Sequence, residues 1–275
     1  MEIGNMKTRT ILAAALAVAA VLALAALAVC GGPSDGDGRG NGASAPPALN
    51  DPIVYGVRVN GKMLSSDNLV VQCGTGTATY DPATNELTLA DATITKGTAA
   101  AGTAGSPCIF SDSTLTIRLE GFNTIEAPID AGIQIGTTSG QADLEILGPG
   151  SMEIHVPSGV GIRVSGELYI NGVSLDVISE QECIMAAQML IEGEDSHILL
   201  NRGSSGGACA VISSRDAEID EGIIRGNRAP LFDFASGGSW NVTNGGLVVG
   251  YDQSLAPFTP GSDTGISTIP ATNAT

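Results

Sequence analysis

An apolar–x–apolar triplet recurs seven times along the chain, and its alternation predicts a β-strand with one buried face and one outward face. The triplets are residues 87–89, 115–117, 144–146, 168–170, 189–191, 217–219 and 240–242. Equivalent residues of successive triplets lie 21 to 29 positions apart, so the repeating unit is about 25 residues long. No unit shows a helical period, which indicates a β-repeat.

Two further apolar segments flank each triplet, and a glycine follows six of the seven triplets within four residues. Glycine supplies the backbone freedom that a sharp corner needs. The first triplet has Asp91 at that place. The segments after the corner are centred on Ile125, Ile154, Leu175 with Val177, Ile198 with Leu200, Ile223, and Leu247 with Val249. Those before the triplets are centred on Ile109, Ile133 with Ile135, Ile162 with Val164, Ile184, Val211 and Leu231.

Each unit therefore predicts three short strands joined by turns, and no single unit can bury its own apolar face. Stacked units can, so the pattern predicts an all-β fold, a parallel β-helix of about six to seven coils filled by aliphatic ladders. A β-sandwich is the alternative, because it also consists of short strands with frequent turns. The constant order of triplet, glycine and apolar segment favours the solenoid.

Composition divides the chain into five predicted segments. Before the repeats, Asn60-Gly61 and residues 81–85 are hairpin-type turns, which are typical of a cap that covers an open solenoid end. The segments are a signal peptide at 1–29, a flexible tether at 30–50, an N-terminal β cap at 51–86, the β-helix at 87–254 and a loose C-terminal tail at 255–275.

The first thirty residues have the layout of a bacterial export signal. Lys7 and Arg9 precede an unbroken apolar run over residues 11–29, and Cys30 follows. Residues 27–30 resemble a lipoprotein lipobox, although Val29 stands where that motif has Gly, Ala or Ser. The resemblance implies a lipid on Cys30 and a chain anchored outside the cytoplasmic membrane. Plain secretion and an uncleaved anchor are the alternatives.

The excess of acidic over basic residues restricts the kinds of partner that the chain can bind. Twelve basic residues stand against 29 acidic ones, which gives a formal net charge of −17. A chain that acidic lacks the basic surface that nucleic-acid phosphates require, so we expect no nucleic-acid partner. Contact with a membrane is expected through the N-terminal lipid only.

The start of the repeat region resembles a known extracellular module. The stretches VNG at 59–61, YDPATNELTL at 80–89 and ATI at 92–94 resemble a module of surface proteins from Gram-positive gut bacteria, several described as carbohydrate-binding-domain-containing. The resemblance implies a right-handed parallel β-helix at the cell surface that binds polysaccharide, with calcium as a candidate cofactor. It carries over no defined binding residues.

Acidic side chains are densest over residues 176–221, and several recur at comparable places in successive units. Stacked carboxylates repel each other unless a cation bridges them, and calcium takes six to eight oxygen ligands. The candidate calcium ligands are Glu192, Glu194, Asp195, Asp220 and Glu221. A solvated acidic surface is the alternative interpretation.

Sugar-binding faces use exposed aromatic rings, and this chain has few of them. Tyr169 lies between two inward positions of its triplet and is the candidate ligand-binding aromatic. Trp240 occupies an inward position, which favours packing over binding.

The sequence favours a non-catalytic module over an enzyme, because no pair of aspartates falls at equivalent places of adjacent units and lysine is scarce after the signal. We expect a cell-surface module that binds polysaccharide or host glycan. The alternatives are an adhesive surface protein with a protein partner, and a polysaccharide lyase or hydrolase.

The remaining cysteines have two interpretations. Cys73, Cys108, Cys183 and Cys209 are expected as buried small hydrophobes. A Cys183–Cys209 disulfide between adjacent units is the alternative, although parallel side chains at strand spacing place the Cβ atoms slightly too far apart.

Overall fold

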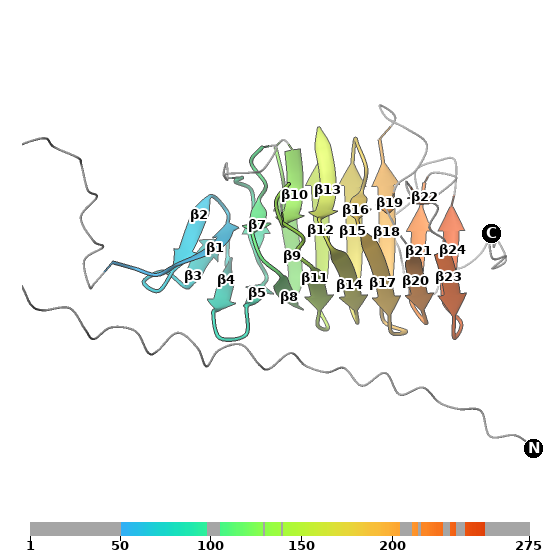
Figure 1. Cartoon of the computed structure of the whole chain (residues 1–275), viewed down its shortest axis with the longest axis horizontal. Coiled ribbons are helices and arrows are strands. Elements are labelled where there is room, and N and C mark those ends of the chain that lie inside the picture. The colour runs from blue at the N-terminus through green and yellow to red at the C-terminus, as the bar shows by residue number, and fades with distance from the viewer. Residues whose placement is uncertain are drawn as a thin grey trace, which may run out of the picture. The chain divides into compact units, whose positions relative to one another are not determined.

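The computed structural model describes residues 51–97, 105–128, 130–138, 140–203, 211–213, 216–227, 232–234 and 240–250. These residues form an all-β structure, a β-solenoid of about four turns (Figure 1). Within them, no helix has the length and apolar character needed to cross a membrane. The predicted signal peptide, Cys30, the tether and the predicted C-terminal tail lie outside the described residues.

Three sheets form the walls of the solenoid. The eight-stranded sheet has the order β2 (Lys62–Ser65), β1 (Val54–Val59), β7 (Ile109–Ser111), β10 (Asp130–Ile135), β13 (Gly159–Val164), β16 (Ile184–Ala186), β19 (Val211–Ser213), β22 (Phe232–Phe234). The nine-stranded sheet has the order β23 (Trp240–Thr243), β20 (Ala217–Asp220), β17 (Gln188–Glu192), β14 (Glu167–Asn171), β11 (Leu144–Leu147), β8 (Leu115–Glu120), β5 (Glu86–Ala90), β4 (Gly76–Asp81), β3 (Val70–Cys73). The seven-stranded sheet has the order β24 (Leu247–Gly250), β21 (Ile223–Gly226), β18 (His197–Arg202), β15 (Ser174–Ser179), β12 (Ser151–Val156), β9 (Phe122–Glu126), β6 (Thr93–Ile94).

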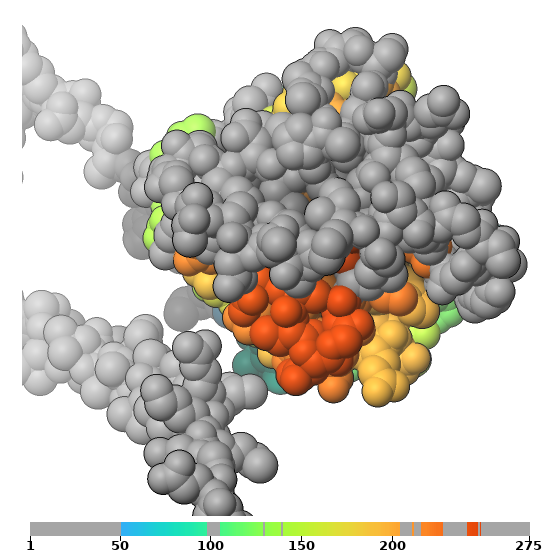
Figure 2. All heavy atoms as spheres, turned by 90° about the vertical axis from the view of Figure 1, so that its right-hand side faces the viewer, coloured from blue at the N-terminus to red at the C-terminus, as the bar shows by residue number. Residues whose placement is uncertain are grey.

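Parallel pairing distinguishes this fold from the sandwich alternative. Strands three apart in the chain are neighbours within a sheet, and every described pairing among β6 to β24 is parallel. A sandwich of the predicted kind would pair its strands antiparallel. Figure 2 looks at the end of the stack that carries the last described strands, drawn in red in front of the orange and yellow ones.

The predicted triplets align in register, with one exception. Leu115, Leu144 and Leu168 are successive partners, and the same register continues through β17, β20 and β23. In the first triplet, Leu87 pairs with Ile117 and not with Leu115. This two-residue slip keeps the same side chains inward, because the side-chain period of a strand is two.

In strand β21, the residue that faces the core is one position away from the predicted one. Ile198 pairs with Ile224, which is fully buried, and Ile224 pairs with the buried Val248. The sequence prediction centred these segments on Ile223 and on Leu247 with Val249. For β21, the prediction that Ile223 faces inward was therefore wrong. Ile223 is only partly buried and faces outward. Leu231 lies outside the described residues.

The corners carry the backbone conformation that the glycines predict. Five of the six predicted corner glycines have positive φ: Gly121, Gly148, Gly172, Gly193 and Gly245. At the remaining corner the residue with positive φ is Glu221, at 64°, directly before Gly222. In the first unit Asp91 adopts a φ of 49°. Asp91 also accepts a hydrogen bond from the backbone N–H of Phe122 at 3.1 Å, which ties one corner to the next.

Aliphatic ladders fill the interior, as predicted. One ladder runs through Ile125, Ile154, Val177 and Leu200, each at most 1% exposed. Burying such side chains contributes about 1.5–3 kcal/mol each. Cys73, Cys108 and Cys183 are buried free thiols, which confirms the hydrophobic interpretation for these three. Cys209 lies outside the described residues.

The N-terminal end of the described chain pairs differently from the rest. β1 and β2 are antiparallel, and so are β3, β4 and β5. β5 also pairs with β8 in parallel, so it joins the antiparallel strands to the parallel ones.

Candidate functional site

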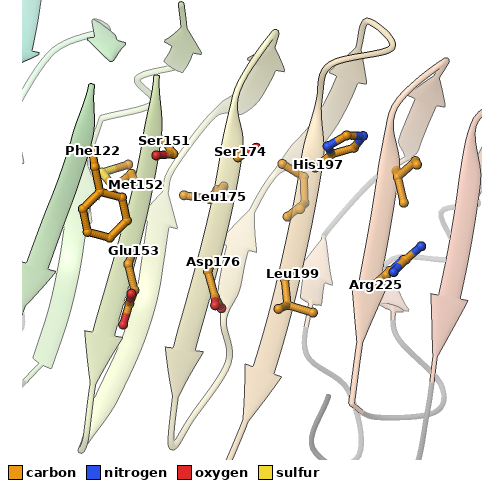
Figure 3. Close-up of a pocket in the computed structure, with 12 residues that line it drawn as sticks. Phe122, Ser151, Met152, Glu153, Ser174, Leu175, Asp176, His197, Leu199 and Arg225 are labelled. Carbon is orange, nitrogen blue, oxygen red and sulfur yellow. The ribbon is translucent and has the colours of Figure 1, made fainter. Parts of the chain in front are cut away.

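The outer face of the seven-stranded sheet carries two rows of side chains that cross successive strands. Parallel register places Phe122, Ser151, Ser174, His197 and Ile223 in the first row. It places Thr124, Glu153, Asp176, Leu199 and Arg225 in the second row. Figure 3 draws members of both rows as sticks, among them Phe122, Ser151, Ser174 and His197 of the first row and Glu153, Asp176, Leu199 and Arg225 of the second.

A hollow of about 350 Å³ lies over these rows. That volume falls within the range of small-ligand pockets. Its lining includes an aromatic ring, two carboxylates, an imidazole, an aliphatic side chain and a guanidinium, from Phe122, Glu153, Asp176, His197, Leu199 and Arg225. We define these six residues and the two rows around them as the outer hollow.

Glu153 and Asp176 are direct partners on adjacent strands. Burial, and after it the charge of Glu153, raises the pKa of Asp176 from 3.8 to about 6, while a hydrogen bond with Asn201 acts in the opposite direction. Within the described part of the chain, Oδ1 of Asp176 is buried and accepts no hydrogen bond. A half-buried carboxylate with an unsatisfied oxygen beside a like charge is costly, and such groups concentrate at functional sites.

Phe122 places an exposed aromatic ring at one end of the outer hollow. Its exposed fraction is 56%, although large apolar side chains normally pack inward in this fold. The preceding Gly121, with a φ of 66°, and the hydrogen bond from the Phe122 N–H to Asp91 fix the start of β9. Exposed rings of this kind provide flat apolar surface for a ligand.

The sequence analysis missed Phe122, because it considered only tyrosine and tryptophan as binding aromatics. A signal was present in the sequence, since Phe122 directly follows a corner glycine and stands one position before Asn123 and three before the predicted inward residue Ile125, which places it on the outward face. The equivalent positions in the next two units hold Ser151 and Ser174, which are small and polar.

The expectation of a non-catalytic module relied in part on a search for aspartate pairs alone. The sequence analysis looked for pairs of aspartates at equivalent places of adjacent units and found none. The structure brings together a glutamate and an aspartate, Glu153 and Asp176, at such places. The search was too narrow because acid–base chemistry accepts either carboxylic acid.

Tyr169 lies on β14, on the outer face of the nine-stranded sheet and not in the outer hollow. Its hydroxyl donates to Oε2 of Glu192 at 2.6 Å and accepts from Nδ2 of Asn171 at 2.8 Å. Burial, and after it the hydrogen bond to Glu192, raises the pKa of Tyr169. The polar tip of this ring is therefore occupied by partners within the chain.

The five candidate calcium ligands lie near the end of the same nine-stranded sheet. Glu192 and Asp220 are direct partners, and Oδ1 of Asp220 accepts from Thr243 Oγ1 at 2.9 Å and Asn244 Nδ2 at 2.7 Å. Glu194 and Asp195 lie in the turn after β17, and Glu221 lies in the next corner. Across the described ranges, no three His, Cys, Asp or Glu side chains come close enough to hold a metal ion. Calcium at these residues stays a prediction.

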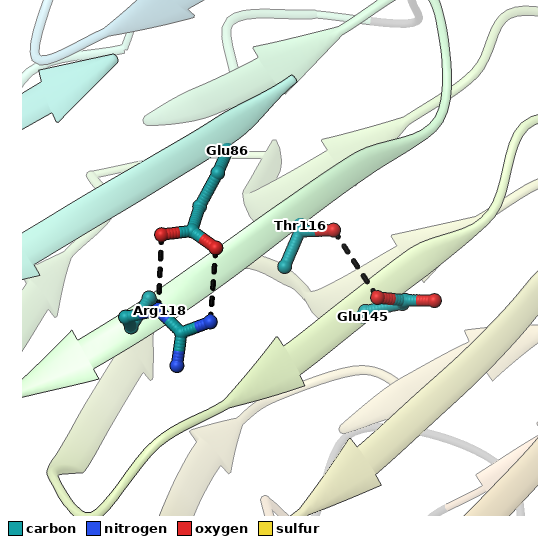
Figure 4. A network of polar contacts seen from close by, with 4 residues as sticks. All are labelled: Glu86, Thr116, Arg118 and Glu145. Atoms are coloured by element: carbon teal, nitrogen blue, oxygen red, sulfur yellow. Dashed lines mark hydrogen bonds and ion pairs between the residues drawn. The ribbon is translucent and has the colours of Figure 1, made fainter. Parts of the chain in front are cut away.

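Elsewhere on the nine-stranded sheet, outward charges are paired across strands. Arg118 donates Nε–H and Nη2–H to the two carboxylate oxygens of Glu86 at 2.9 and 3.0 Å, and Thr116 donates to Glu145 at 3.2 Å (Figure 4). Among the described ion pairs, none includes Glu153 or Asp176. The carboxylates of the outer hollow thus differ from the paired carboxylates around them.

No protein-family model, curated protein or solved structure matches this chain.

Proposed function

We propose that the chain is a non-catalytic module that binds a glycan in the outer hollow. The observation that carries the proposal is the exposed ring of Phe122 at the end of a hollow lined by both polar and aliphatic side chains. A pyranose ring has an apolar face that stacks on an aromatic surface and a rim of hydroxyls that bonds to polar groups. Phe122 supplies the first kind of contact, and Ser151, Ser174 and Glu153 supply the second.

The length of the rows supports an extended ligand. Each row crosses five strands, and neighbouring strands lie about 4.8 Å apart, so a row extends over about 19 Å. An extended sugar chain that runs across the strands meets a new side chain at every strand. A short oligosaccharide matches that arrangement.

The predicted export signal and the resemblance to extracellular modules support the part of the proposal that puts this function at the cell surface, with Cys30 as the lipidated residue and secretion as the alternative. The same proposal includes a right-handed solenoid of six to seven coils. The coil count is supported by the strands β5, β8, β11, β14, β17, β20 and β23, which carry one triplet each.

A glycan array tests the binding proposal. The wild-type chain is expected to retain glycans, and Phe122→Ala is expected to lose most of that binding without a change in melting temperature. Tyr169→Ala removes an outward aromatic ring from a different sheet and is expected to keep the binding. An array without retained glycans overturns the proposal and favours a protein partner, and unchanged binding by Phe122→Ala overturns the site.

Hydrolysis is the second candidate, because Glu153 and Asp176 form a carboxylate pair in which Asp176 has a raised pKa. A protonated Asp176 would donate to the glycosidic oxygen, and Glu153 would act as base or nucleophile. Release of reducing ends from a retained glycan, lost in both Glu153→Gln and Asp176→Asn, favours this candidate. Intact glycan after long incubation favours the non-catalytic module.

A further inference from the structure

We propose that the outer hollow selects glycans with free amino groups, whose ammonium lies between Glu153 and Asp176 while a sugar ring packs on Phe122. This inference rests on the proposed glycan-binding function and names the class of glycan. It starts from the two carboxylates, which are the acidic groups of the hollow lining.

The two carboxylates need a positive charge that the described chain does not place between them. They are direct partners on strands about 4.8 Å apart, so their charges repel. Arg225 is in the same row, but strand β18, with Leu199 at that position, lies between it and Asp176. Glu86 in the nine-stranded sheet has Arg118 as a bidentate partner, and the pair in the hollow has no equivalent among the described residues.

The unsatisfied Oδ1 of Asp176 favours a ligand that donates hydrogen bonds. An ammonium group has three N–H donors, so it can bond to Oδ1 and to the Glu153 carboxylate at the same time. Hydrogen bonds between charged groups are about twice as strong as neutral ones. A bound cation would also favour the ionised form of Asp176, whose pKa is raised by burial and by Glu153.

Two other occupants fit the hollow less well. Two carboxylates are too few oxygen ligands for calcium, which takes six to eight. A lysine side chain would satisfy the carboxylates, but it leaves the ring of Phe122 and the hydroxyls of Ser151 and Ser174 without a matching surface. An amino sugar combines the ammonium, an apolar ring face and hydroxyls in one unit. The net charge of −17 also favours the approach of cationic ligands.

Titration calorimetry at pH 7 with two oligosaccharides of equal length tests the inference. The probes are a tetramer of glucosamine and a tetramer of N-acetylglucosamine, which differ only in the charge and bulk of the nitrogen substituent. We expect the wild type to bind the glucosamine tetramer at least about tenfold more tightly, as charged hydrogen bonds of ordinary strength imply. Glu153→Gln and Asp176→Asn are expected to bring the ratio close to one.

Glu126→Gln is the matched control. Glu126 is on the outer face of the same sheet, where it is the strand partner of His155, and its carboxylate pairs with the His155 ring at 3.3 Å. The control removes the same charge and is expected to keep the preference. Phe122→Ala is expected to weaken the binding of both tetramers by a similar factor.

Equal affinity for the two tetramers overturns the inference, and so does a preference that survives in Glu153→Gln and Asp176→Asn. A trilysine peptide that binds more tightly than the glucosamine tetramer also overturns it, because the hollow would then recognise a peptide cation. If the array retains glycans but shows no preference for those with free amino groups, this inference is overturned and the proposed glycan-binding function is not. An array without any retained glycan overturns the proposed function as well.

Discussion

Asp176 is held by the fold in a setting that disfavours its charge. Its pKa is raised from 3.8 to about 6, first by burial and then by Glu153, so the folded chain binds this proton more tightly than the unfolded chain does. Folding stability from this group is therefore full below about pH 4 and is lost as the pH rises through 6. A residue that lowers stability at neutral pH is better explained by ligand binding than by folding.

Replacement of Asp176 by Asn is expected to raise the melting temperature at pH 8 and to change it little at pH 4. At pH 4 the native carboxyl is already protonated and resembles the amide, whereas at pH 8 the variant removes the repulsion with Glu153. Thermal unfolding at the two pH values measures the difference. Glu126→Gln is the control, for which we expect no rise in melting temperature at pH 8. If Asp176→Asn shifted the melting temperature equally at both pH values, the argument would be contradicted.

The buried thiols give a second prediction at this scale. Burial raises the pKa of Cys108 and Cys183 to about 12, and it also raises the pKa of Cys73. Because the thiolate is the reactive form, alkylation at pH 8 should be slow in the native chain and fast in urea. Peptide-level mass spectrometry reads each cysteine separately. Rapid native labelling of Cys108 or Cys183 would show that the described core is wrong there.

The corner residues show which backbone conformations could be predicted from the sequence. Glycines were expected at the corners for their positive φ, and five of them have it. Asp91 and Glu221 show that a corner also accepts residues other than glycine, and Asp91 accepts a hydrogen bond from the backbone of the next corner. Aspartate is among the residues that enter the left-handed region more readily, whereas nothing in the described contacts explains the glutamate.

At the scale of the element, alternation predicted which strand faces point inward, except where apolar residues are adjacent. Ile223 and Ile224 are consecutive, and a strand can place either one inward, so the pattern alone does not fix the phase. Register with Ile198 fixes it, because the core needs a side chain above that residue. That information comes from the neighbouring coil and is not local to the strand.

A pair of variants tests which of Ile223 and Ile224 faces the core. Ile224→Ala removes a fully buried side chain and should lower the free energy of unfolding by about 2–5 kcal/mol. Ile223→Ala removes a partly exposed one and should cost less than about 1.5 kcal/mol. Urea unfolding followed by circular dichroism compares them. A larger loss for Ile223→Ala would reverse the assigned phase of β21.

At the scale of the whole described structure, the repeat predicted a parallel solenoid, but not the place of the site. Alternation in the sequence separates inward from outward positions, but it does not indicate which outer face is hollowed. Glu153 and Asp176 become neighbours only through the register of β12 and β15. The acidic density that suggested calcium lies on another sheet, where the described carboxylates have partners within the chain such as Tyr169 and Thr243.

The central claim is that the outer hollow of the seven-stranded sheet is where this chain holds a glycan. A crystal structure of the full chain soaked with the glucosamine tetramer tests it most directly. We predict a sugar ring stacked on Phe122 and an ammonium nitrogen within hydrogen-bond distance of both Glu153 and Asp176. An oligosaccharide bound beside Tyr169 on the nine-stranded sheet, with an empty hollow, would contradict the claim.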